Sequence, residues 1–237
     1  MPQDGAPATT GVDPERLWLR PAEPRRGRRP SFSREAIVAA AVTLADAEGL
    51  EAVTMRRVAA EVGAGVMSLY SYAPDKETLL ELMVDHVSGE LTAAAPTGDW
   101  RADLKAVART QRAHMLRHPW LPAALTARRT PGPNTLAFLE GALAALRPTG
   151  LDGAARLEVF AQLTAFVAGH VGYETAHAAV AGSPERAASE ARYLAAVASD
   201  GHHPELAGAL SAPGRPLSPE ATFTRFLDRL VDGLGTG

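Results

Sequence analysis

Two short segments with helical periodicity, joined by a tight turn, constrain the fold of this chain more than any other feature. The second segment spans 66–72, and a Gly-Ala-Gly turn at 63–65 separates it from the first. The first segment places four apolar residues on one face: Met55, Val58, Ala59 and Val62. Neither segment is long enough to be stable alone, because nucleating a helix is costly. The pair must therefore pack on a larger helical framework.

The sequence on either side supplies that framework. Ser33 is a good N-cap, and the apolar periodicity that follows it stops at Gly49. Thr54 caps the first short helix, and Asp75 caps a longer helix after the second one. Because the long helix after Ser33 offers an apolar face, the two short helices can pack on it. We predict one helical unit over 33–92.

Composition and periodicity favour helices along the whole chain. Of its 237 residues 46% are hydrophobic, and Leu and Ala prevail over runs of β-branched residues, so the fold class is all-α. After a linker near 93–99, a second helical domain is predicted over 99–237, with a mobile loop at 200–219. The helices expected in this domain are 100–118, 121–126, 134–146, 152–181, 183–199 and 219–234.

The same composition argues against several classes of protein. A chain without cysteine forms no disulfides and no thiolate metal sites. No apolar stretch is long enough to span a bilayer, and the polar, Pro-rich N-terminus lacks the apolar core of a secretory signal. We therefore expect a cytoplasmic protein with no membrane partner.

A helix, a tight turn with glycine and a second helix make the helix-turn-helix pattern, whose second helix enters the major groove of DNA. At this point the chain resembles the TetR family of transcriptional regulators, from Ser33 to about Val87. The resemblance is carried by "AIVAAAVTLADAEGLEAVTMRRVAAEVGAG" and "SLYSYAPDKETLLELM". Farther on, "RHPWL" (117–121) resembles the ligand domains nearest the tetracycline repressor. The resemblance implies a three-helix DNA-binding domain followed by a helical ligand-binding and dimerisation domain.

The resemblance assigns DNA contacts to individual residues. Lys76 stands at a helix start where the family has a phosphate-contacting lysine. Two positions depart from the family pattern: Tyr72 stands in place of a histidine, and Gly65 stands where a serine N-cap is common. A tyrosine hydroxyl still binds phosphate but carries no sequence information, and Tyr70 has a core role as an equal alternative. The full predicted set is Thr54, Arg56, Gly65, Val66, Met67, Ser68, Tyr70, Tyr72 and Lys76, of which 66–68 stand where base readers belong.

A basic arm precedes this domain. The net charge of the chain is −3, and four basic and nine acidic residues between Ser33 and Ser88 give that stretch −5. Residues 1–32 are predicted to be a disordered Arg/Pro-rich arm, in which the apolar island Glu15–Arg20 makes only a transient surface contact. Four arginines of this arm are expected to contact phosphates or the minor groove, with a solubility tail as the alternative: Arg25, Arg26, Arg28 and Arg29.

The second domain is expected to bind a small-molecule effector. The candidate contacts are His114, Trp120, Phe138, Phe166, His170, Tyr173 and His177, although aromatic residues at helical spacing are more often core. His170, Glu174 and His177 share one helix face, and so do His114 and His118. We favour a polar pocket wall or a hydrogen-bonded cluster over a metal site, because metal sites normally draw ligands from several elements. No metal and no cofactor is predicted.

The predicted function is a ligand-responsive transcriptional regulator, a repressor released from a palindromic DNA operator by a small molecule. The alternative is a constitutive DNA-binding regulator without a ligand. An enzyme is disfavoured because no G-x-S-x-G elbow, Walker loop or Rossmann glycine cluster is present. A homodimer is expected through helices 152–181 and 219–234, and the helix around Leu121 is expected to couple the effector to the helix at 75–90. The apolar residues that motivate the dimer are Leu157, Phe160, Ala161, Thr164, Ala168, Phe223, Leu227 and Leu230.

Overall fold

The computed structural model describes residues 13–19, 32–126, 130–211 and 217–234, without the side chains of residues 126 and 179–181. All regular secondary structure in these ranges is helical, which confirms the all-α prediction. In the same ranges no helix combines the length and apolarity needed to cross a membrane. The elements are η1 (Glu15–Leu19), α1 (Arg34–Glu48), η2 (Leu50–Ala52), α2 (Met55–Glu61), α3 (Val66–Leu69), α4 (Lys76–Ser88), α5 (Trp100–Arg117), α6 (Leu121–Thr126), α7 (Pro133–Ala145), η3 (Arg147–Thr149), α8 (Gly153–Ala181), α9 (Pro184–Ser199), α10 (Pro204–Ser211) and α11 (Pro219–Gly233).

Helices α1 to α4 form the N-terminal unit, and its helix starts follow the predicted caps. Side-chain oxygens of Ser33, Thr54 and Asp75 accept hydrogen bonds from backbone N–H groups in the first turns of α1, α2 and α4. The unit closes around a core of fully buried apolar side chains, which includes Ile37, Val58, Leu69, Leu79 and Met83. Helix α2 packs on α1, and α3 packs on α2. The two short helices are therefore held by a larger framework, as the sequence requires.

The apolar island before this unit is more structured than expected. Residues 15–19 form one helical turn, Leu17 is buried, and Trp18 packs against the main core. The expectation of a transient surface contact is therefore wrong for this turn. The periodicity of so short a segment carries no information about where it docks. The proposed domain limits stay predictions.

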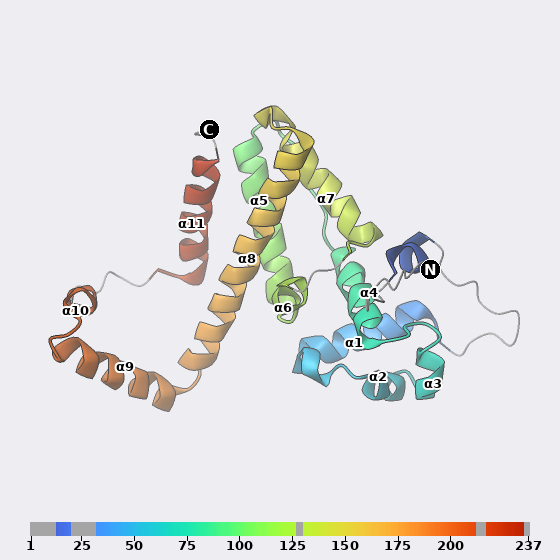
Figure 1. Cartoon of the computed structure of the whole chain (residues 1–237), viewed down its shortest axis with the longest axis horizontal. Helices are drawn as coiled ribbons and strands as arrows, with labels where there is room; N and C mark the ends of the chain where they lie inside the picture. Colours follow the sequence, from blue (N-terminus) through green and yellow to red (C-terminus); the bar gives the residue numbers. More distant parts are fainter. Residues whose placement is uncertain (1–12, 20–31, 127–129, 212–216, 235–237) are drawn as a thin grey trace, which may run out of the picture.

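The C-terminal unit is built around α8 and α5, which pack along each other (Figure 1). Helix α7 packs on both, and α11 packs on α5. Helices α9 and α10 extend away from this body and bury no side chain of their own. The prediction of a loop over 200–219 is partly wrong, because α10 occupies Pro204–Ser211. Gly208 lies within this helix and weakened the helical signal in the sequence.

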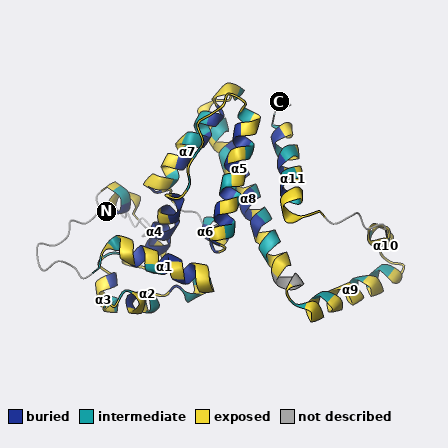
Figure 2. Cartoon of the chain, turned by 180° about the vertical axis from the view of Figure 1, so that it is seen from behind, coloured by how far each residue is buried: buried dark blue, intermediate teal, exposed yellow. Residues whose placement is uncertain are grey.

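Helix α4 connects the two units. It packs on α1 of the N-terminal unit and on α6 and α7 of the C-terminal unit. From Thr78 to Ser88 all of its side chains are buried except that of His86, as the dark blue ribbon in Figure 2 shows. A helix covered on both sides transmits displacement between its neighbours, because close-packed interiors are not easily compressed.

Candidate DNA interface and effector site

A sharp turn sets the angle between α2 and α3. Gly63 adopts a left-handed conformation (φ 66°), which costs glycine little and other residues more. The Ala64 N–H donates to the Ala59 carbonyl at 2.8 Å and locks the turn. Gly65 then starts α3 with extended backbone and no side-chain cap, so this N-terminus depends on packing by Leu69, which is fully buried.

The opposite side of α3 faces solvent. Met67 is 81% exposed, although a large apolar side chain gains by burial. Ser68 is exposed beside it, while Val66 is half-buried and packs against the core. Met67 and Ser68 therefore lie on the solvent side of α3, where the predicted base readers should lie, and Val66 contributes more to packing the helix against the core.

The residues predicted to contact phosphate differ in the contacts that they make within the protein. Tyr70 is exposed. The Tyr72 hydroxyl donates to the Phe32 carbonyl at 3.4 Å, and its ring packs edge-on against Phe32. The Lys76 ammonium donates to the Leu50 carbonyl at 3.3 Å, which holds it beside the start of α4. Tyr72 thus fastens the segment before α1, a role that the sequence did not reveal.

The remaining predicted DNA contacts divide into capping and surface residues. The Thr54 hydroxyl accepts a hydrogen bond from the Arg57 N–H at 3.2 Å, so Thr54 shapes α2 whether or not it meets DNA. Arg56 is exposed, whereas Arg57 forms a two-armed ion pair with Glu48 of α1. The arm arginines at 25, 26, 28 and 29 lie outside the described residues.

The seven predicted effector contacts do not meet in one cavity. His114 and Trp120 are buried where the two units join. Phe138 is buried against Phe160 of α8, with ring centroids 6.3 Å apart. The other four lie on separate parts of α8. Phe166 and His170 both pack against Phe223 of α11, whereas Tyr173 and His177 face α9.

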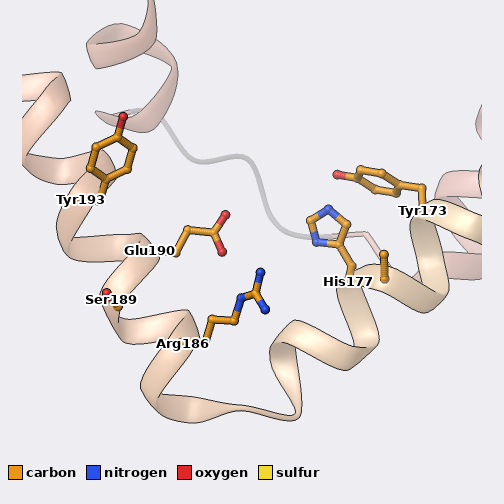
Figure 3. Close-up of a pocket in the computed structure, with 7 residues that line it drawn as sticks. Tyr173, His177, Arg186, Ser189, Glu190 and Tyr193 are labelled. Carbon is orange, nitrogen blue, oxygen red and sulfur yellow. The ribbon is translucent and has the colours of Figure 1, made fainter.

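An open cavity of about 530 Å³ lies between the end of α8 and α9 (Figure 3). Tyr173 and His177 line it from α8, with ring centroids 4.1 Å apart. Helix α9 contributes Arg186, Ser189, Glu190 and Tyr193 to the lining. Sequence reasoning missed these four because their position depends on the angle between α8 and α9, which the turn at 182–183 sets.

An ion-pair network separates His170 from His177. Arg112 of α5 donates to both carboxylate oxygens of Glu174 at 2.9 Å, and it also contacts Glu220 of α11. Burial lowers the pKa of His170, which packs against Phe223. Glu174 therefore serves the packing of α5, α8 and α11. The polar wall expected from His170, Glu174 and His177 is divided between two environments.

Two carboxylates of the N-terminal unit hold the C-terminal unit. The Asp46 Oδ1 atom of α1 accepts hydrogen bonds from Trp120 Nε1 at 2.7 Å and from His118 Nδ1 at 2.8 Å. The Asp85 Oδ1 atom of α4 accepts the backbone N–H groups of Asn134 and Thr135, both at 3.0 Å. Asp85 thus caps α7, because the residue at its N-cap, Gly132, has no side chain.

The contact between Asp85 and the start of α7 depends on the absence of a side chain at position 132. A Cβ atom on Gly132 would lie 2.4 Å from Cγ of Asp85, so the start of α7 would have to move. We expect Gly132→Ala to reduce the free energy of unfolding by roughly 1–3 kcal/mol through overpacking. Gly153→Ala is the matched control, because nothing lies within 4 Å of a Cβ there, and its stability should stay equal or rise. Urea unfolding of the two variants checks this, and equal stabilities would refute the close contact.

Comparison with known proteins agrees with this geometry. Residues 37–83 match the family model described as bacterial regulatory proteins, tetR family, and residues 92–237 match the model of the tetracyclin repressor-like C-terminal domain. The chain is 43% identical to the transcriptional repressor DrrR1 of Streptomyces coeruleorubidus over 157 residues, covering 65% of this chain and 58% of that protein. It is 34% identical to an HTH-type transcriptional regulator of Saccharopolyspora erythraea, covering 96% of this chain and 94% of that protein.

Solved structures give the same result. Apo ActR from Streptomyces coelicolor superposes with a TM-score of 0.74 at 27% identity, covering 87% of this chain and 98% of ActR. ActR in complex with actinorhodin gives a TM-score of 0.73, with 87% of this chain and 99% of that one covered. Both the helix-turn-helix unit and the larger C-terminal unit match this family, so the chain belongs to the TetR family of bacterial transcriptional regulators.

Proposed function

We propose that this protein is a homodimeric repressor that leaves a palindromic operator when a small molecule binds its C-terminal unit. The observation that carries the proposal is the exposed, apolar Met67 on the short helix α3, which packs on α2. DrrR1 is named a transcriptional repressor, which favours repression over activation. A protein that acts on chromosomal DNA in a bacterium works in the cytoplasm.

Base reading and phosphate binding are expected to be separable in this surface. Replacing Met67 with Gln should change which bases are preferred, because an apolar side chain reads the thymine methyl and an amide reads adenine. Lys76→Ala should weaken binding to all DNA sequences almost equally. It should also reduce the slope of log affinity against log salt concentration by about one unit. Selection of binding sites from a random DNA library, followed by salt titrations, measures both. Equal loss of specificity from the two variants would refute this division of roles.

The cavity between α8 and α9 is the proposed effector site. Its volume of about 530 Å³ falls within the usual range for small-molecule pockets. Tyr173 and Tyr193 offer aromatic surfaces, and His177 and Arg186 offer polar groups toward the same space (Figure 3). We therefore expect an aromatic effector with hydrogen-bonding groups. ActR has been solved with two small molecules, actinorhodin and (S)-DNPA.

Variants in this cavity distinguish sensing from DNA binding. His177→Ala and Tyr193→Ala should keep the parent's operator affinity without effector, but need roughly tenfold more effector for release. His170→Ala is the comparison, because His170 packs on Phe223 instead of lining the cavity. Operator-release assays with aromatic compounds, beginning with actinorhodin, measure the response. If no compound releases the protein, the constitutive regulator becomes the better description.

The route from the cavity to the DNA-binding surface runs through α4. Helices α6 and α7 contact α4, which also packs on α1, and Asp85 ties α4 to the start of α7. An effector that prefers one placement of α4 lowers the affinity for DNA, and DNA must lower the affinity for the effector by the same factor. The coupling free energy between two such sites is typically about 1–3 kcal/mol. This route adds α7 to the helix around Leu121 that the sequence indicated.

The dimer is proposed to form through α8 and α11. Leu157 on α8 and Phe226 on α11 are 48% and 43% exposed, which leaves apolar surface on both helices. Three residues that the sequence analysis assigned to the dimer interface, Ala168, Phe223 and Leu227, are instead buried within their own subunit. The exposed face of α8 includes Ala154, Leu157, Ala161, Ala165, Gly169 and Gly172. Small residues of this kind let two helices approach closely.

A further inference from the structure

Three metal-ligating side chains gather where α4, α5 and α6 meet. His114 and His118 lie one turn apart at the end of α5, with ring centroids 5.0 Å apart. Glu90 follows α4, and its Oε2 atom lies 3.4 Å from His118 Nε2 and 3.9 Å from His114 Nδ1. One ligand atom from each residue lies within 4.8 Å of the other two. The sequence pattern indicated only the two histidines, and the third residue follows another helix, α4.

His114 is buried without a hydrogen-bond partner. It is 2% exposed, and neither ring nitrogen has a partner in the described parts of the chain. Buried polar groups are nearly always hydrogen-bonded, so an unpartnered imidazole at this depth points to a missing ligand.

The contacts of His118 point to a cation at the same place. Asp46 Oδ1 can only accept, so the nitrogen 2.8 Å from it, Nδ1, carries a proton. In neutral His118 the Nε2 lone pair then faces the carboxylate oxygen of Glu90. Two electron-rich atoms at this distance repel unless a proton or a metal ion lies between them. A carboxylate that orients a histidine through its other nitrogen is a common support for metal binding.

The surrounding charges also favour a cation. Asp46 and Glu90 supply two carboxylates, and Arg117, which contacts Glu90 Oε2, supplies a guanidinium. The Arg117 side chain is mostly exposed, so it can turn into solvent. Trp120 donates to Asp46 and fixes its position.

We propose that Glu90, His114 and His118 form a zinc site at the joint between the two units. Two imidazoles and one carboxylate suit Zn²⁺, with water as the fourth ligand on the exposed side of Glu90. Bonds of about 2.0–2.2 Å in a tetrahedron place ligand atoms roughly 3.3 Å apart, close to the observed 3.4 and 3.9 Å. Bound zinc would fasten the end of α4 to α5, independently of the effector cavity.

The test measures zinc binding by the full-length protein purified without a histidine tag. We expect one Zn²⁺ per chain by calorimetry, and a visible spectrum of tetrahedral Co²⁺ when cobalt replaces zinc. At a free zinc concentration 100 times Kd, the Tm should rise by about 5 to 10 °C. Glu90→Gln and His118→Ala should each weaken binding at least tenfold. Glu90→Gln changes an exposed residue, so it keeps the test informative if His118→Ala does not fold.

Two further variants are expected to affect zinc binding differently from the ligand substitutions. Arg117→Ala should tighten zinc binding, because it removes a competing positive charge from Glu90. His203→Ala should leave binding unchanged, because the exposed pair of His203 and Asp200 lies on another part of the chain. Absence of stoichiometric zinc, or loss of binding with His203→Ala but not Glu90→Gln, would overturn the proposal.

Discussion

Ala161→Arg on α8 is expected to convert the dimer to a monomer and to abolish specific operator binding. Ala161 is exposed in the middle of the small-residue face of α8, close in sequence to Leu157. Two symmetry-related copies would bring two arginines together in an apolar contact, where unpaired charge is costly. Because a palindrome is bound by two linked recognition helices, a monomer loses one half-site. We expect at least 10³-fold weaker specific binding, the usual minimum gap between specific and non-specific affinity.

Ala137→Arg is the matched control for this prediction. Ala137 is an exposed alanine on α7, outside the proposed interface, so the variant should remain dimeric and bind the operator. Analytical ultracentrifugation at micromolar concentration gives the oligomeric state, and fluorescence anisotropy with operator DNA gives the affinity. An Ala161→Arg protein that stays dimeric would place the interface elsewhere.

Replacing Arg25, Arg26, Arg28 and Arg29 together with Gln is expected to weaken operator binding strongly at physiological salt. The stretch from Ser33 to Ser88 has a net charge of −5, so the field of the folded domain does not attract DNA. Each arginine that neutralises a phosphate adds about 0.9 to the log–log salt slope. With four arginines in each subunit, the slope should fall by several units and the affinity by about 100-fold or more. The selected operator sequence should stay the same.

Substitution is a better test of the arm than truncation, because Leu17 and Trp18 pack against the folded core. The control changes four exposed arginines of the C-terminal unit to Gln, namely Arg101, Arg109, Arg147 and Arg192. Both variants change the net charge equally, so only a contact with DNA makes them differ. Similar salt slopes in salt titrations of the two variants would assign the arm to solubility.

The sequence by itself determined the local structure of the DNA-binding unit. Caps at Ser33, Thr54 and Asp75 and the turn at Gly63 follow from hydrogen bonds and backbone preferences within a few residues. The exposure of Met67 follows from its position opposite Leu69 on a short helix. Features that depend only on residues a few positions apart can be read from the sequence without the tertiary structure.

Only the tertiary structure decided which distant residues meet. Trp120 resembled a pocket residue, yet its indole binds Asp46 of α1. His170 and His177 share a helix face, yet one packs on Phe223 and the other faces α9. Glu90 reaches His118 because the residues that follow α4 and α5 come together. The crossing angles of long helices set these contacts, and the angles depend on packing summed over the whole core, which no single segment specifies.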